Sequence, residues 1–558
     1  MIKYIRYVLY AAIVAISFML FNAWQAEHPS VSAQTAVQQQ QNGAVSTTVT
    51  HNVNQVVQLT NQTFQSIPKN RVIDIQTDVL DIKIDTLGGN IVQASLLKYP
   101  ITLNSDKPYL LLNDEPNNLY VVQSGLTKSS IVTDNQHLAQ YKSSQTSFSL
   151  KPGDTKLVVN LSGTQDGMSV EKNYVFYPKT YAIDVTYNIK NNSGKSWVGN
   201  YYMQIVHDVD EQTTANGFLT RGLHSFEGVA IYTPENKYEQ FKSSKLQEEP
   251  LNSNVSGGWI ATPQHYFLSA WVPSKEGIYH FYSQVTADSM YTVGMIGHQM
   301  TIDPSKTVQL ASKLFVGPKL AKQLDAAAPL LSHTIDYGWM WFISILLFKA
   351  LAFINHFVGN WGWSIVIITL LIKLVFYKLS ETSYVSMARM RTLQPKMQQL
   401  KERYKDDKEG MSKAVMGLYK SEKVNPLGGC LPILIQIPVF FALYYVLLQS
   451  VELRQAPFIF WITDLAVKDP YYILPILMGL TMFAQQKLSP APPDAAQAKL
   501  MLFLPVLMTI IFVNFPAGLV LYWFTNNLLS IMQQWVVTYR CEHGHYPRRK
   551  KREWKKKK

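Results

Sequence analysis

WGWSIVIITLLIKLVFYK occupies residues 361–378 and is apolar almost throughout, apart from a lysine at position 373 and another at its end. Several such runs in one chain are too apolar for a water-soluble core, and the tryptophans lie where a spanning helix would meet lipid headgroups. Similar runs occupy residues 431–449, 471–487, 500–514 and 518–537. The sequence therefore predicts a core of five membrane-spanning helices within residues 361–540.

The N-terminus predicts a sixth span. Lys3 and Arg6 precede an apolar stretch from Tyr7 to Ala23, and no convincing small-x-small cleavage site follows it. We therefore expect an uncleaved signal anchor over residues 1–24, with its N-terminus in the cytoplasm. The next segment, residues 25–70, is rich in Gln, Ser, Thr and Asn and predicts a flexible linker.

Polar and apolar residues alternate over residues 71–320. From Tyr181 to Lys190 the odd positions are Tyr, Ile, Val, Tyr and Ile, whereas the even positions from Asp184 onward are polar. A period of two is typical of strands with one buried face. Turn signals punctuate the pattern and no helical periodicity separates the strands. This region therefore predicts a large antiparallel β-sandwich in the periplasm.

Residues 321–360 predict connecting and interfacial helices. The apolar stretch 339–358 is interrupted by Lys349, Asn355 and His356. If it spanned the membrane, the basic stretch 378–423, with eleven Lys and Arg against six acidic residues, would lie outside. Basic segments favour the cytoplasm. We therefore expect residues 339–358 to form an amphipathic helix in the outer interface.

Residues 379–429 predict a cytoplasmic helical hairpin. Apolar residues recur there every three or four positions, at Met390, Leu393, Met397 and Leu400 in the first helix and at Met411, Val415 and Leu418 in the second. Pro395 should kink the first helix. The stripe fits packing within the hairpin, and it also fits a soft surface for apolar segments of another protein. The sequence thus predicts a multi-domain membrane protein with six transmembrane α-helices, a periplasmic β-sandwich and this hairpin.

The net charge of +13 is concentrated near the C-terminus. The tail, residues 541–558, contains the basic run Arg548, Arg549, Lys550, Lys551 and Arg552. An even number of spans returns this tail to the cytoplasm, as the positive-inside rule requires. The same charge could also bind anionic lipids or ribosomal RNA.

Catalytic signatures are missing from the sequence. It has no H-E-x-x-H, G-x-S-x-G or Walker motif, and the two cysteines, Cys430 and Cys541, form no paired motif. Cys541, His543 and His545 lack the spacing and fourth ligand of a usual metal site. The five core spans contain no Asp or Glu, which disfavours a proton- or cation-coupled transporter. We expect neither an enzyme nor a bound cofactor or metal.

A group of polar residues lies inside the predicted spans. Lys373 has Thr369 one turn before it, Gln436 lies in the second core span, and Asn526 and Asn527 lie in the last. Interhelical hydrogen bonds and snorkelling of the lysine to the headgroups are ordinary explanations. The alternative is a wet cavity in which Lys373 attracts an acidic segment of another protein. The apolar neighbour of that segment would then enter lipid without nucleotide hydrolysis, driven by its burial.

The long motifs of the chain resemble one family. They are DYGWMWFIS at 336–344, FVGNWGWSI at 357–365, KVNPLGGC at 423–430, SVELRQAPF at 450–458, DPYYILPILMG at 469–479 and FPAGLVLY at 515–522. With them the chain resembles the Gram-negative YidC membrane protein insertases over nearly its whole length. The sandwich resembles supersandwich folds.

This resemblance implies an inner-membrane insertase and chaperone for nascent membrane proteins, which works alone or with the Sec translocon and docks ribosomes. It also implies a hydrophilic groove with one cation, usually Arg, at the position of Lys373. A lysine keeps the charge but lacks the planar donor fork. Tyr522 matches a groove aromatic, and Trp523 replaces a common second tyrosine.

Two rival readings remain at the level of sequence. The polar groove could serve a channel or passive transporter. The sandwich could be a carbohydrate-binding or enzymatic module, with His207, Asp208 and Asp210 as its site.

Overall fold

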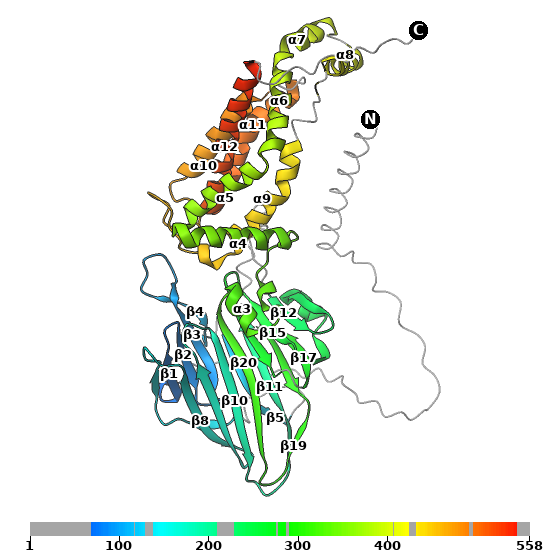
Figure 1. Ribbon diagram of the computed structural model, residues 1–558. Coiled ribbons are helices and arrows are strands. Elements are labelled where there is room, and N and C mark those ends of the chain that lie inside the picture. Colours follow the sequence, from blue (N-terminus) through cyan, green and yellow to red (C-terminus); the bar gives the residue numbers. More distant parts are fainter. Residues whose placement is uncertain are drawn as a thin grey trace, which may run out of the picture. The chain divides into compact units, whose positions relative to one another are not determined.

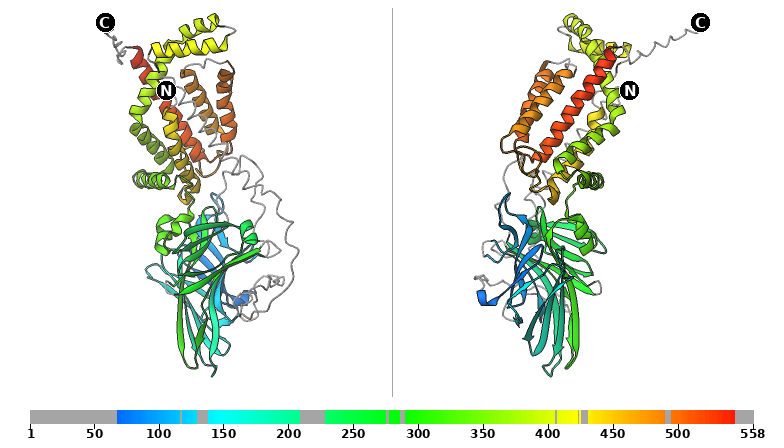
Figure 2. Two further views of the ribbon diagram at one scale, coloured as in Figure 1. Left: turned by 90° about the vertical axis from the view of Figure 1, so that its right-hand side faces the viewer. Right: turned by 60° about the vertical axis from the view of Figure 1, so that its left-hand side comes forward.

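The computed structural model describes residues 68–115, 118–128, 138–208, 228–274, 277–285, 290–404, 407–422, 424, 431–489 and 495–543. The predicted signal anchor, nearly all of the predicted linker and the basic tail from residue 544 lie outside these ranges. The described part contains a β-sandwich followed by helices, as Figure 1 and Figure 2 show. The predicted combination of a β-sandwich domain with a helical C-terminal region is therefore confirmed.

Two sheets form the sandwich. Among the described residues the first has eleven strands, in the order β14-β17-β18-β11-β5-β3-β2-β1-β7, with β19 paired to β11 and β4 to β3. The second has nine, in the order β13-β12-β15-β16-β20-β10-β9-β8-β6. The first sheet comprises β1 Val72–Gln76, β2 Leu80–Asp85, β3 Asn90–Pro100, β4 Pro108–Leu112, β5 Tyr120–Thr127, β7 Ser147–Ser149, β11 Trp197–Asp208, β14 Asn252–Ser256, β17 Ile278–Val285, β18 Met290–Gly297 and β19 Met300–Ile302. The second comprises β6 Gln140–Lys142, β8 Leu157–Gln165, β9 Met168–Phe176, β10 Ala182–Asn191, β12 Gly228–Thr233, β13 Lys237–Lys242, β15 Trp259–Pro263, β16 Phe267–Pro273 and β20 Thr307–Pro318.

Strand β10 follows the period-two pattern of its sequence. Ile183, Val185, Tyr187 and Ile189 are all at most 1% exposed, and the residues between them are partly exposed. The strand pairs antiparallel with β9 and β20. Its inner face meets the other sheet, where the Tyr187 hydroxyl donates to the Ser124 carbonyl at 2.8 Å. Alternating strands thus bury one face of each sheet against the other.

The sandwich departs from the prediction at one edge of the first sheet. There β7 runs parallel to β1, with Asp74 opposite Ser147. A strand can pair in parallel only after a long connection. The region between β1 and β7 provides it, because it includes four further strands of the first sheet. Period-two patterning alone carries no information about this direction.

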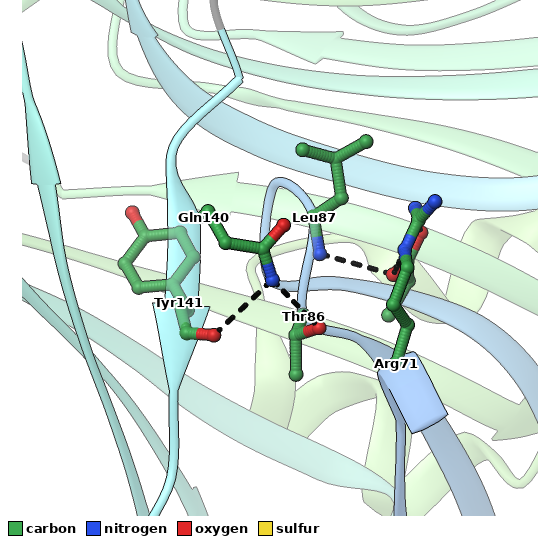
Figure 3. A network of polar contacts seen from close by, with 6 residues as sticks. Arg71, Thr86, Leu87, Gln140 and Tyr141 are labelled. Carbon is green, nitrogen blue, oxygen red and sulfur yellow. Dashed lines mark hydrogen bonds and ion pairs between the residues drawn. The ribbon is translucent and has the colours of Figure 1, made fainter. Parts of the chain in front are cut away.

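Polar contacts link the two sheets near this edge. Figure 3 shows Gln140 of β6, in the second sheet, donating to the Thr86 hydroxyl at 3.0 Å, just after β2 of the first sheet. In the same cluster Asp85 pairs with Arg71 and accepts the Leu87 amide at 3.0 Å. These contacts provide hydrogen-bond partners for backbone and side-chain polar groups at this edge of the sandwich.

Short helices join the two parts. They are α3 Ala321–Ala327 and η5 Leu331–Thr334, between β20 and α4. Three further short helices lie within the two parts, namely η1 Lys69–Arg71, α2 Ser243–Glu248 and η7 Val451–Leu453. In the structure, α3 and η5 occupy the start of the segment 321–360, for which connecting helices were predicted.

The C-terminal part is helical. Its helices are α4 Trp341–Val358, α5 Trp361–Val375, α6 Tyr377–Thr392, α7 Gln394–Arg403, α8 Lys408–Ser421, α9 Leu431–Gln449, α10 Ile473–Leu488, α11 Ala495–Phe512 and α12 Ala517–Glu542. Each of the five core spans expected from the apolar runs corresponds to one of α5, α9, α10, α11 and α12. Their crossing of a membrane, the count of six spans and the domain boundaries stay predictions.

Helix α4 lies across the long helices of the bundle (Figure 1). Among the described helices it alone is long and apolar enough to cross a membrane, and the bent pair α5–α6 is a second candidate if taken as one broken span. Length and composition therefore do not distinguish a spanning helix from an interfacial one. Its large apolar residues Phe342, Leu346 and Phe353 are exposed by 57%, 67% and 66%. The interfacial position of α4 stays a prediction.

The segment expected to form the helical hairpin differs in detail from that expectation. Its first helix is divided, because α6 ends at Thr392 and α7 begins at Gln394, with Pro395 in its first turn. A proline fits the first turn of a helix, where its missing N–H has no partner to lose. The helix is therefore interrupted at Leu393, two residues before Pro395. Figure 1 shows α7 and α8 beyond the end of α6.

Candidate functional site: a polar cavity with one lysine

A cavity of about 340 Å³ lies among helices α5, α6, α9, α10, α11 and α12. Its polar lining consists of Lys373, Ser380, Ser383, Tyr384, Gln436, Gln485, Gln486, Ser489, Tyr522, Asn526, Asn527, Ser530 and Gln534. Its apolar lining includes Ile437, Met501 and Leu504, which are exposed by about 40%. Of the described residues that line the cavity, Lys373 alone carries a charge.

Lys373 lies two residues before the end of α5. Its Nζ donates to the Ser530 hydroxyl of α12 at 2.8 Å, and that hydroxyl donates to the Asn526 carbonyl at 2.6 Å. A serine at i+4 can return its proton to its own helix in this way and still accept the ammonium group. The lysine therefore contacts a neutral acceptor, and no carboxylate among the described lining residues compensates its charge.

A second polar contact joins α9 to α12. The Gln436 amide donates to Asn526 Oδ1 at 2.5 Å. Gln436 and Asn526 are half-buried, so they form part of the cavity wall without being sealed inside it. Together with the lysine and serine they form a continuous polar strip from α5 through α12 to α9.

Aromatic rings close the cavity beside this strip. Tyr522 is only 2% exposed, and its ring stacks near Phe440 of α9 at 6.3 Å between centroids. Trp523 meets Phe440 edge to face at 4.5 Å and Phe512 of α11 at 5.1 Å. Such aromatic packing fixes the position of α12 against α9 and α11.

Two residues predicted for the groove have other surroundings. Thr369 is 1% exposed, donates to the Ile365 carbonyl at 2.6 Å and does not line the cavity. Asn527 does line it, but its side chain is 5% exposed and reaches the Thr481 hydroxyl of α10 at 3.5 Å. The cavity thus gathers six of the seven residues named for the groove, namely Lys373, Gln436, Tyr522, Trp523, Asn526 and Asn527.

The contribution of α6 to the cavity was not predicted from the sequence. Ser380, Ser383 and Tyr384 line the cavity because α6 bends away from α5 by 70° and packs against α12. Gln485 and Gln486, near the end of α10, also line the cavity and were not predicted. Adjacent glutamines at the end of an apolar run were a usable signal for the latter pair, whereas nothing in the apolar pattern indicates the bend.

The apolar stripe of the predicted hairpin lies between helices. Leu393 and Val415 are 6% and 8% exposed, and Met390, Met397, Leu400, Met411 and Leu418 are half-buried. Helices α7 and α8 are joined by the Tyr419 hydroxyl on Met397 Sδ at 3.5 Å and by an ion pair of Lys396 with Glu422 at 2.7 Å. These contacts favour packing between α7 and α8 as the role of the stripe.

Other candidate groups fall partly outside the described residues. The basic run Arg548, Arg549, Lys550, Lys551 and Arg552 lies wholly outside, as do His545 and Asp210. His207 and Asp208 end β11, where the His207 ring packs against Tyr120 and Tyr291 at 4.2 and 5.4 Å. Within the described residues no group of three or more His, Cys, Asp or Glu is arranged to hold a metal.

Comparison with known proteins covers almost the entire chain. Residues 72–350 match the family model of the YidC periplasmic domain, and residues 353–544 match that of the 60Kd inner membrane protein. The membrane protein insertase YidC of Coxiella burnetii (strain Dugway 5J108-111) is 46% identical over 573 residues, which cover 99% of both chains. That of Legionella pneumophila (strain Corby) is 46% identical over 540 residues, covering 96% of both.

A solved structure of an active YidC insertase, with its first transmembrane domain resolved, covers 83% of this chain and 92% of its own. It has 17% sequence identity and a TM-score of 0.38, so the assignment depends on the sequence matches alone. The matches at 46% identity span essentially the full length of both relatives. The chain belongs to the YidC family of inner-membrane protein insertases.

Proposed function

We propose that this protein inserts nascent membrane proteins into the inner membrane and assists their folding, through the polar cavity around Lys373 and without nucleotide hydrolysis. The observation that carries the proposal is the lone lysine in a wall of amides and hydroxyls. A cation without a compensating carboxylate attracts an acidic segment, and neutral amides can exchange hydrogen bonds with a passing backbone.

The apolar lining of the same cavity supports the next step, in which the apolar segment of the client enters lipid. Ile437 of α9 and Met501 and Leu504 of α11 line the cavity and are exposed. A client whose polar segment contacts Lys373 would hold its apolar segment against these residues. Burial of about 20 apolar residues in lipid then supplies the driving force.

Charge variants of Lys373 test the proposal. Reversal of one charge changes an attraction of about 1–4 kcal/mol at 4 Å into a repulsion of the same size. Lys373→Glu should therefore impair insertion of a single-span client with an acidic translocated segment in proteoliposomes, and Lys373→Arg should retain insertion. The matched control is Lys378→Glu, since Lys378 is 90% exposed five residues further on.

A client with its acidic residues replaced by neutral ones adds a second control. Its insertion should depend much less on the charge at position 373. Equal insertion of the acidic client by the wild type and by the Lys373→Glu and Lys373→Arg variants would remove the lysine from the mechanism. A passive channel would instead show solute flux that responds to these variants without any effect on client insertion.

Removal of residues 25–320 tests whether the sandwich is the functional module. We expect the remaining helices to insert a small single-span client in proteoliposomes. Loss of all insertion by a correctly assembled helical part would favour a sandwich-based function. In that case His207 and Asp208 would become the first residues to examine.

The family assignment also supports specific partners. We propose that the protein works alone or beside the Sec translocon, and that the basic hairpin and tail contact translating ribosomes and anionic lipids. In the proposed topology both termini are cytoplasmic and the sandwich is periplasmic. Deletion of residues 548–558 should weaken ribosome co-sedimentation in a salt-sensitive manner, because phosphate contacts weaken with salt. Unchanged co-sedimentation would contradict a role for the tail.

A further inference from the structure

A second cavity, of about 790 Å³, lies among α3, η5, α4 and strand β13. It shares no lining residue with the cavity around Lys373. Twelve of its lining residues follow one another closely between positions 332 and 353, where the chain leaves the sandwich and enters α4. Its walls therefore belong mainly to one continuous stretch of the chain.

Four charged residues line this cavity, and their charges balance. Lys322 and Asp325 lie on α3, Asp336 lies in the connection after η5, and Lys349 lies on α4. None of the four forms an ion pair with another described residue, although Asp336 accepts the Gly338 amide at 2.9 Å. Two cations and two anions thus face a single space without neutralising one another directly.

Apart from Lys349 and His356, the α4 side of the cavity is apolar, and it continues onto an exposed apolar surface. Trp341 and Phe353 line the cavity and are exposed by 55% and 66%. Phe342 and Phe357, next to this wall, are exposed by 57% and 72%. Lys349 lies between these aromatic residues on the same helix. Its side chain is therefore the charged group of the cavity closest to the surface that would face the hydrocarbon.

The opposite wall is firmly held by the sandwich. The His333 ring lies between Tyr238 of β13 and Trp341 of α4, with centroids at 5.8 and 6.3 Å. The Trp259 indole donates to the Pro329 carbonyl at 2.8 Å, which fixes the connection between α3 and η5. Ring contacts and a hydrogen bond thus tie this wall of the cavity to the sandwich.

We propose that this cavity binds the headgroup of phosphatidylethanolamine from the outer leaflet. Lys349, nearest the apolar surface, would hold the phosphate, and the ammonium would lie farther out near Asp325 and Asp336. The glycerol and upper acyl chains would pack on Trp341 and Phe353. The inference goes beyond client insertion because its ligand is a lipid and its site is a separate cavity.

The balance of charges selects this lipid class. An anionic headgroup would gain from the lysines but would be repelled by two carboxylates. A choline headgroup has the same net charge as ethanolamine but has no N–H to donate to a carboxylate. A primary ammonium and a phosphate satisfy both kinds of lining group with charge-assisted hydrogen bonds.

The test uses the full chain in nanodiscs made of equal parts phosphatidylethanolamine, phosphatidylcholine and phosphatidylglycerol. After release from the nanodiscs, native mass spectrometry measures which lipid remains bound. We expect phosphatidylethanolamine to exceed each of the others by about tenfold, the ratio that one charge-assisted hydrogen bond provides. Soluble O-phosphoethanolamine, added in excess, should not displace it, because the apolar wall contributes to the binding of the lipid.

Two variants test the contact of the phosphate and the contact of the ammonium group separately. Lys349→Glu should remove the retained lipid, whereas Asp325→Asn should leave a lipid bound but reduce the preference for ethanolamine over choline. Lys468→Glu, an exposed lysine outside the cavity, should retain the wild-type pattern. A thermal unfolding curve for each variant verifies that it is folded.

Several results would overturn the proposal. Equal retention of the three lipids by the wild type, or a preference for phosphatidylglycerol, would contradict the charge argument. Displacement by soluble O-phosphoethanolamine would identify a site for the free headgroup. Retention unaffected by Lys349→Glu in folded protein would place the lipid elsewhere, and a co-purified peptide in the cavity would replace the lipid as occupant.

Discussion

Lys172 is buried in the core of the sandwich and gives the sharpest prediction. It lies on β9, is 0% exposed, and has no ion pair with any described residue. Its Nζ donates to the carbonyls of Ser124 at 3.0 Å and Gly88 at 3.3 Å, and to Asn90 Oδ1 at 3.4 Å. Burial lowers the pKa of the Lys172 amine well below its usual value.

The sign of the pH dependence follows from this direction. Between the lowered pKa of the folded state and the ordinary lysine value of about 10.4, the unfolded chain binds a proton that the folded chain does not. The free energy of unfolding therefore rises with pH, by up to about 1.4 kcal/mol per pH unit. From pH 7 to pH 9 the rise attributable to Lys172 amounts to up to about 2.7 kcal/mol.

The perturbation is Lys172→Met, which keeps the length of the side chain and removes the titration. We expect the wild type to gain stability from pH 7 to pH 9 relative to this variant. At pH 7 two effects oppose each other in the variant. The variant gains stability because folding no longer has to deprotonate the lysine amine. It loses about 1–3 kcal/mol because the Gly88 carbonyl loses its hydrogen-bond donor.

Urea unfolding of the full chain in nanodiscs, read by pulse proteolysis of the sandwich at pH 7, 8 and 9, measures the difference in slope. Groups that titrate identically in both proteins cancel in this comparison. Lys190→Met, at an exposed position of the neighbouring strand β10, is the matched control and should parallel the wild type. Parallel lines for the wild type and Lys172→Met would refute the reasoning, since Lys172 would then stay protonated in the core.

Three further predictions concern the helical part. Burial raises the pKa of Glu452, after α9, to about 7, so the folded state binds a proton at this carboxyl more tightly than the unfolded state does. In thermal unfolding, Glu452→Gln should therefore stabilise the chain more at pH 7.5 than at pH 5. An equal effect at both pH values would contradict this prediction. Gly362→Ala should destabilise the chain by about 1–3 kcal/mol, because its new Cβ would lie 2.1 Å from the Phe458 ring. At the control position Gly417 an added Cβ would meet no atom within 4 Å, so Gly417→Ala should stabilise α8 by up to about 1 kcal/mol. Loss of stability in Gly417→Ala but not in Gly362→Ala would contradict the steric argument. A photo-crosslinking residue at Met501, on the exposed cavity wall, should capture a stalled nascent client, and no crosslink would contradict a client path along α11.

The regular elements could be predicted because burial imposes a period on the sequence. In β10 the inward positions from Ile183 to Ile189 are apolar, and the five core helices coincide with long apolar runs. The parallel pairing of β7 with β1 could not be predicted, because strand direction depends on chain connections rather than on which face is buried. The end of α6 at Thr392 likewise depends on local backbone geometry that the Met and Leu spacing does not record.

The cavity was predictable in part for a related reason. Lys373, Gln436 and Asn526 are conspicuous because polar groups inside apolar runs need a partner or water. Thr369 has the same appearance in the sequence but satisfies its hydroxyl on its own helix at the Ile365 carbonyl. A helix that is apolar on all sides does not reveal which side faces its neighbours, so the sequence alone could not separate these cases.

The bend between α5 and α6 has a mechanical consequence. Where the helix changes direction by 70°, the Tyr377 carbonyl accepts the Gln533 side chain of α12 at 3.2 Å, so the corner is fastened to the helix that carries Ser530. Beyond the corner α6 supplies cavity wall on its way to α7 and α8. A force applied to α7 and α8, for example by a large partner bound there or by a chain under tension, would rotate α6 about this bend. The rotation would change the width of the cavity around Lys373.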